Sequence, residues 1–308
     1  MKLAQLDGSL DSIAHARIGR RTFLNRAGLV GLGVAASAFT LAGARGALAQ
    51  QEESESSSEQ ALEAAQAKDT VTEIFTAALI AEDLATTFYY NGLIGGVIQD
   101  PSLAGPGGSA NMVSSSGNAG NVNYLQAALT QEISHANLFR SLLGGSAPGK
   151  DPVQTFYFPS GAFDTLTAFT GLLNALENAF IGAYLNAIQE FSVMSTRASL
   201  NQATQGSSQT GQYTAEKLDY FAKVAASILG IEAEHRVLGR VISNTNPANN
   251  LNYEQTDGLN AVYNGPDSAV AALIPFLSPG TGPGFSLAAA LADQGSVSIP
   301  STGNPPAF

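Results

Sequence analysis

The 308-residue chain contains no cysteine. This absence excludes disulfide bonds, thiolate metal sites and cysteine nucleophiles. Histidine is scarce as well, with three residues in the whole chain, His15, His135 and His235. Carboxylate and imidazole are therefore the only strong metal ligands that the sequence offers, and imidazole is available at very few positions.

Charged residues make up only 13% of the chain against 44% hydrophobic residues, which is typical of a globular protein rather than a disordered one. Basic residues are the scarcer kind. Six of the 14 fall within residues 1–49, so from residue 50 onward eight basic residues face 23 acidic ones, and the net charge is −15. A body this acidic, without a basic cluster, is not expected to bind nucleic acid or an anionic membrane.

Residues 1–49 have the pattern of an export signal. Arg20-Arg21-Thr22-Phe23-Leu24 precedes an apolar stretch at 27–44 that is rich in Gly and Ala, and Ala47-Leu48-Ala49 fits a small-residue cleavage site. The segment resembles a twin-arginine signal peptide, with an uncleaved N-terminal anchor as the alternative interpretation. No later segment approaches an apolar run of about 20 residues, so we expect a soluble mature protein in the periplasm or outside the cell.

Two short patterns stand out in the rest of the chain, Glu132-Ile-Ser-His135 and Glu232-Ala-Glu-His235. On a helix, a Glu and a His three residues apart lie on the same face and can reach one point in space. Because His15 falls in the signal segment, both remaining histidines follow a Glu at this distance, and the spacing predicts metal ligands. Glu234 points away from Glu232 by about 200° and is expected to be exposed.

Apolar periodicity predicts helices at four segments, 69–91, 123–143, 164–193 and 214–243. The first and third each hold a single acid within an apolar stripe, Glu82 and Glu177. A lone buried carboxylate is costly, so each is expected to have a partner or a metal. For the first helix the alternative is a different rotation about its axis, in which Glu82 meets solvent and Asp83 marks the exposed face.

The segments between these helices differ in character. Residues 50–66 are acidic and are interpreted as a flexible spacer. The connection at 144–160 is long enough to run the length of a helix, so the second and third helices could be parallel. Residues 244–308 hold eight of the 13 prolines and are interpreted as an irregular extension wrapped on the bundle, with one helix-like stretch at 269–277.

The predicted fold is an all-α four-helix bundle over residues 67–243. One Glu from each of two helices and a Glu-x-x-His from each of the other two form the ligand set of ferritin-like di-iron and di-manganese bundles. The predicted ligands are Glu82, Glu132, His135, Glu177, Glu232 and His235. Two of the carboxylates can bridge two divalent ions, and these oxygen and nitrogen ligands suit both iron and manganese.

From about residue 70 to 243, the chain resembles a ferritin-like domain of the desiccation-related group, notably at residues 131–140 and 228–235. The resemblance implies the bundle fold and a ligand role at all six positions. The long Gly/Ser-rich loops and the proline-rich tail differ from storage ferritins and argue against a hollow cage. A homo-oligomer of another kind is compatible with the sequence.

Two classes of function are left open. The first is an enzyme whose dinuclear centre reacts with O₂ or peroxide, as in ferroxidases, rubrerythrin-like peroxidases and manganese catalases. The second is a structural or desiccation-protective envelope protein whose metals only hold the bundle together. Tyr89 and Tyr184 each lie two turns beyond a predicted ligand Glu and face the interior. We interpret them as core aromatics with satisfied hydroxyl groups, and electron relay or binding of an oxygen species is the alternative.

Overall fold

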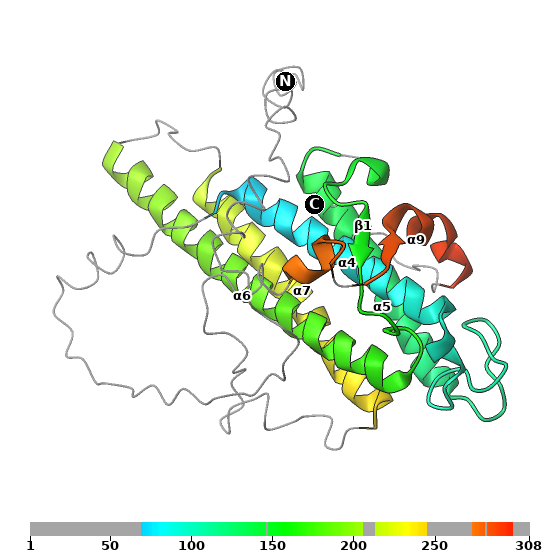
Figure 1. Ribbon diagram of the computed structural model, residues 1–308. Helices are drawn as coiled ribbons and strands as arrows, with labels where there is room; N and C mark the ends of the chain where they lie inside the picture. The colour runs from blue at the N-terminus through cyan, green and yellow to red at the C-terminus, as the bar shows by residue number, and fades with distance from the viewer. Residues whose placement is uncertain (1–68, 146, 206–212, 245–272, 281, 298–308) are drawn as a thin grey trace.

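The computed structural model describes residues 69–145, 147–205, 213–244, 273–280 and 282–297 (Figure 1). Four long helices dominate it: α4 (Val71–Ile94), α5 (Ala119–Leu142), α6 (Leu166–Gln205) and α7 (Ala215–Ile242). The predicted all-α bundle is thus confirmed. The predicted signal peptide at 1–49, the spacer at 50–66 and residues 245–272 of the tail lie outside the described residues.

Polar side chains at the helix starts explain where the helices begin. Thr70 and Glu73 form a reciprocal capping box at the start of α4, and the Thr214 side chain accepts a hydrogen bond from the Lys217 backbone N–H at the start of α7. At the other end of α5, the chain turns through Gly144 and Gly145, which have φ values of 101° and 82°. Glycine adopts this left-handed region without a side-chain penalty, so the helix stops there as predicted.

Two apolar clusters fill the two ends of the bundle. One contains Leu93 near the end of α4, Leu125 and Leu173 near the starts of α5 and α6, and Ile242 at the end of α7. The other end is built around Phe75 of α4, whose ring lies 4.9 Å from that of Phe221 and 5.7 Å from that of Phe191. Helices α5 and α6 therefore start at the same end and run parallel, as the length of their connection allowed.

The second cluster collects several aromatic and aliphatic residues from the beginnings of α4 and α7 and from the later parts of α5 and α6. Helices α4 and α5 thus form one antiparallel pair, and α6 and α7 form the other. Between the two apolar clusters, at mid-height, lies the band of the bundle that holds the polar residues described below.

The described part of the C-terminal extension contains regular elements that the sequence did not predict. Strand β2 (Gly284–Ser286) pairs antiparallel with β1 (Thr155–Tyr157) of the long connection, and α9 (Leu287–Asp293) then packs on α4. Leu287 and Ala290 of α9 are fully buried. The predicted helix-like stretch appears as the 3₁₀ helix η4 (Ile274–Leu277) in its described part. The interpretation of the whole extension as irregular was therefore wrong for 284–293.

Helix α6 is also longer than predicted, ending at Gln205 rather than at 193. Its additional turns still contact the bundle, since Met194 and Ala198 pack against the apolar cluster around Phe75, and the Ser195 hydroxyl donates to the Ala215 carbonyl. These tertiary contacts hold α6 against the bundle beyond its predicted end at 193. Within the described part of the chain, no helix combines the length and apolarity needed to cross a membrane.

Candidate metal centre

The structure brings all six predicted ligand residues together between the apolar clusters. The four glutamates and His235 are buried, with at most 3% of their surface exposed, and His135 is half-buried. Glu82 faces the interior, so the alternative in which it meets solvent is wrong, and Asp83 is buried as well. Glu234 is exposed, as predicted.

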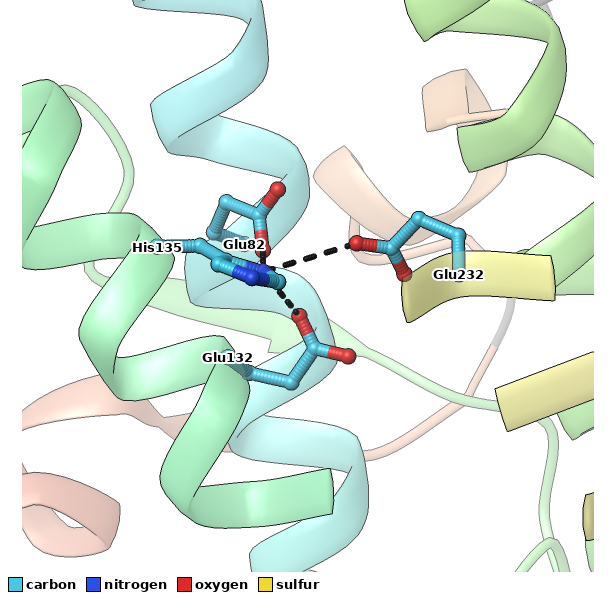
Figure 2. Close-up of side chains that lie close together, drawn as sticks. All are labelled: Glu82, Glu132, His135 and Glu232. Carbon is cyan, nitrogen blue, oxygen red and sulfur yellow. Dashed lines mark hydrogen bonds and ion pairs between the residues drawn. The ribbon is translucent and has the colours of Figure 1, made fainter. Parts of the chain in front are cut away.

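One group of four residues is centred on His135 (Figure 2). Its Nδ1 lies 3.2 Å from Glu82 Oε2, 3.7 Å from Glu132 Oε2 and 3.5 Å from Glu232 Oε1. Figure 2 shows the three carboxylates approaching the imidazole from different helices, Glu82 from α4, Glu132 from α5 and Glu232 from α7. One ligand atom from each of the four residues lies within 4.8 Å of the others.

A second group of four is centred on His235. The His235 Nδ1 lies 2.8 Å from Glu132 Oε1, 3.6 Å from Glu232 Oε2 and 3.8 Å from Glu177 Oε1. These four residues also offer ligand atoms within 4.8 Å of one another. Both imidazoles therefore direct Nδ1 into the carboxylate cluster.

Glu132 and Glu232 belong to both groups. Each presents one oxygen toward His135 and the other toward His235. Each of these four oxygens is buried and faces an imidazole Nδ1 at 2.8–3.7 Å, but none of them, and not Nδ1 of His235, makes a hydrogen bond of good geometry. Buried polar atoms are rarely left in this state, because desolvation without a partner costs about 1–3 kcal/mol each. A pair of divalent cations would satisfy all five atoms and balance the four carboxylates.

Tyr89 and Tyr184 each form a hydrogen bond between α4 and α6 at the centre. The Tyr89 hydroxyl on α4 donates to Glu177 Oε1 on α6, and the Tyr184 hydroxyl on α6 donates to Glu82 Oε1 on α4. Burial and the nearby carboxylates raise the pKa of both phenols, so they remain protonated donors. Their hydroxyl groups are satisfied, as the sequence suggested, but by the predicted metal ligands themselves.

These contacts divide the glutamates into two kinds. In Glu82 and Glu177, a tyrosine occupies one carboxylate oxygen. The second oxygen of Glu82 lies 3.2 Å from His135 Nδ1, and the second oxygen of Glu177 has no hydrogen bond. In Glu132 and Glu232, no hydrogen bond occupies either oxygen. The donor set therefore fits two bridging carboxylates and two terminal carboxylates, each terminal one beside a histidine.

The electrostatics of the metal-free cluster follow from its burial. Burial and the neighbouring carboxylates raise the pKa values of Glu82 and Glu177, because several negative charges cannot share a site of low polarity. Burial alone would lower the pKa of the histidines, but the adjacent carboxylates outweigh it and raise the pKa of His135 and His235. Without metal, the cluster thus holds protons where cations would otherwise lie.

Sequence reasoning missed several residues that surround the centre. Arg140, five positions after His135, donates from Nη2 to Asp83 Oδ1 at 2.5 Å and to Asp151 Oδ2 at 2.9 Å. All three side chains are buried, and Asp151 lies in the long connection. This ion cluster fixes the connection to α4 and α5 next to Glu82. Its only signal in the sequence was that Asp83 and Arg140 sit on helical positions near predicted ligands.

Gln131 was missed as well. Its Oε1 lies 2.8 Å from Nε2 of His235, on the ring edge opposite the carboxylate cluster. Nothing in the local pattern of α5 links this residue to α7, because the contact depends on how the two helices pack.

Comparison with known proteins agrees with the architecture. Residues 70–209 match the family model of the ferritin-like domain. The match spans α4, α5 and α6 and stops before α7, which contributes Glu232 and His235. No curated protein and no solved structure matches the chain. The match and the arrangement of the four helices agree with an all-α bundle of the ferritin-like fold.

Proposed function

We propose that the protein binds two iron or manganese ions in this bundle and uses them for redox chemistry with O₂ or peroxide. The observation that carries the proposal is the pair Glu132 and Glu232, which are shared by both four-residue groups and whose four buried oxygens have no hydrogen bonds. Four carboxylates and two imidazoles form a donor set that suits both iron and manganese.

The role of each side chain in the proposed centre follows from its contacts. Glu132 and Glu232, which belong to both groups, would be shared by the two ions, with Glu82 and His135 completing one half-site and Glu177 and His235 the other. When bound, two such ions supply the electrons for reducing O₂ or peroxide. Burial of the carboxylates limits their contact with bulk water, and the Tyr89 and Tyr184 hydroxyls hold protons at Glu177 Oε1 and Glu82 Oε1.

The test begins with metal analysis of the protein purified from its own host. Two equivalents of iron or manganese are expected, and fewer than one equivalent in Glu132→Gln, which removes a bridging charge from both half-sites. Exposed Glu234 provides the matched control, since Glu234→Gln should retain both equivalents. Absence of metal from the native protein, and from apo protein incubated with either ion, would refute the proposal.

Activity assays separate the chemical classes. Peroxide disproportionation without added reductant indicates a catalase, peroxide reduction that needs a reductant indicates a peroxidase, and Fe(II) oxidation by O₂ indicates a ferroxidase. A metal-loaded protein that is inactive in all three assays would contradict the redox part of the proposal and favour a desiccation-protective role.

We further propose that the protein is exported by the twin-arginine route as a member of the desiccation-related group. The support is the Arg20-Arg21 pair, the apolar stretch at 27–44 and the small-residue site at 47–49. Because this route carries folded proteins, the metal is inserted before export. Replacing both arginines with lysine should leave metal-loaded protein in the cytoplasm, and normal export of that variant would refute this route.

A further inference from the structure

We infer that the two half-sites of the centre differ in metal affinity. Gln131 is the positioning residue that makes the half-site of Glu177 and His235 bind its ion more tightly. The half-site of Glu82 and His135 is then the exchangeable one, through which metal enters and leaves. This inference rests on the proposed metal binding and assigns an order to it.

Most features of the centre are matched between the halves. Each half has one terminal glutamate, and each of these accepts a hydrogen bond from a tyrosine of another helix. Each half has one histidine directed inward through Nδ1, and both share the same two bridging glutamates. These features favour neither half-site, so a difference in metal affinity must come from the residues that surround the ligands.

The first difference lies behind the histidines. A glutamine Oε1 can only accept a hydrogen bond, so its contact of 2.8 Å with His235 Nε2 places the ring proton on Nε2. In the neutral form that binds metal, the lone pair is then on Nδ1, which is buried and faces Glu132 and Glu232. Gln131 therefore fixes both the tautomer and the rotation of His235 in the form that binds metal.

His135 has no such support. Its Nδ1 contacts Glu82, but no residue in the described part of the chain forms a hydrogen bond with its Nε2. Its side chain is 13% exposed, whereas that of His235 is 4% exposed. The ring can take either tautomer and can exchange its contacts with solvent, so the centre communicates with water on this side.

The position of Gln131 explains how one residue serves the other helix pair. It precedes Glu132 and lies four residues, about one turn, before His135 on α5. From there its side chain reaches His235 on α7, so α5 supplies the support and α7 supplies the ligand. Hydrogen bonds of this kind to a metal-bound histidine commonly change metal affinity by about 10–100-fold.

The experiment titrates metal-free protein with Mn(II), followed by calorimetry and electron paramagnetic resonance. We expect calorimetry to show two binding steps. The electron paramagnetic resonance signal of isolated Mn(II) should be highest near one equivalent and should then fall, because the second ion couples magnetically to the first. Release to a chelator should be biphasic, with one fast and one slow ion. In Gln131→Leu, the tighter step should weaken about 10–100-fold, and the two release phases should merge.

Two variants keep the test specific. Gln126→Leu removes another buried amide from α5, one that contacts the Ala110 carbonyl and not the cluster, and should leave both steps unchanged. Gln131→Glu keeps an accepting oxygen and should restore two separated steps. Circular dichroism of each metal-free variant verifies that the helices form.

The outcomes distinguish this inference from the proposed function. If the wild-type protein binds no Mn(II) and no Fe(II), the proposed function itself fails. If it binds two ions with one affinity and one release rate, or if Gln131→Leu retains two separated steps, the inequality assigned to Gln131 is refuted while dinuclear binding stands.

Discussion

Replacing Glu177 by glutamine tests the centre with a minimal change in shape. Glu177 is 1% exposed, receives a hydrogen bond from Tyr89 at Oε1, and has no hydrogen bond at Oε2. The amide keeps the volume and can still accept from Tyr89. It then places an NH₂ group, which cannot bind a cation, at the buried position of Oε2. The substitution therefore has opposite consequences for the metal-loaded and the metal-free protein.

In the metal-loaded protein, Glu177→Gln should be destabilising. Metal that binds only the folded state adds RT ln(1 + [L]/Kd), about 4 kcal/mol when free metal is a thousandfold above Kd. If loss of the carboxylate weakens binding about a hundredfold, the same metal concentration stabilises by only about 1.4 kcal/mol. For a bundle of this size, the difference lowers the melting temperature by roughly 5–10 °C.

In the metal-free protein, the same substitution should be neutral or stabilising. Burial and the nearby Glu232 raise the pKa of Glu177 above its ordinary value of 4.5 in the folded state. The stability that such a group contributes is fully present below its pKa in the unfolded chain, and it is lost as the pH rises through its pKa in the folded protein. Glutamine cannot ionise, so the advantage of the variant should grow with pH, by at most about 1.4 kcal/mol per unit.

Thermal and urea unfolding of both forms at several pH values measure these effects. Glu234→Gln, an exposed substitution on α7, is the control and should change the free energy of unfolding by less than about 0.5 kcal/mol. If Glu177→Gln changes neither form by more than this control, the third helix does not contribute to the centre and the reasoning is refuted.

Three further substitutions probe the surroundings of the centre. Burial raises the pKa of Asp83 to about 8 despite Arg140 beside it. Between about pH 4 and pH 8, the free energy of unfolding of the wild type should therefore fall relative to that of Asp83→Asn by up to about 1.4 kcal/mol per pH unit. Parallel stability profiles of the two proteins in urea would contradict this. Tyr184→Phe removes the donor to buried Glu82 and should lower the metal-free unfolding free energy by about 1–3 kcal/mol, and an unchanged urea midpoint would exclude this bond. Leu287→Ala creates a cavity under α9 and should cost about 2–5 kcal/mol in the same assay, whereas a near-zero cost would mean that α9 is not docked.

The sequence predicted the elements that carry a local signal. Helical periodicity located all four long helices, and the Glu-x-x-His spacing identified His135 and His235 as a pair with the same role. The isolated acids Glu82 and Glu177 were recognisable because each interrupts an apolar stripe. Their meeting at one level of the bundle agrees with the structure, while their role as metal ligands stays a prediction.

The features that the sequence did not reveal depend on contacts between distant segments. Strands β1 and β2 are three residues long and more than 120 residues apart, so neither has a periodic pattern of its own. Ser195 of α6, beyond the predicted helix end, donates a hydrogen bond to the Ala215 carbonyl at the start of α7, a contact that local periodicity does not encode. Likewise, the contact of Gln131 with His235 depends on helix packing, which residue spacing along one helix does not encode.

The division of the ligands between the helix pairs has a consequence for how the protein assembles and comes apart. The group around His135 takes three members from the α4–α5 pair and only Glu232 from the other, while the group around His235 takes three from the α6–α7 pair and only Glu132 from the first. Neither pair completes a four-residue group by itself. Metal binding at the proposed centre therefore requires both helical hairpins to be docked, and we expect removal of metal to weaken the interface between the hairpins before it affects either one. Amide hydrogen exchange should show that interface as the first boundary to open.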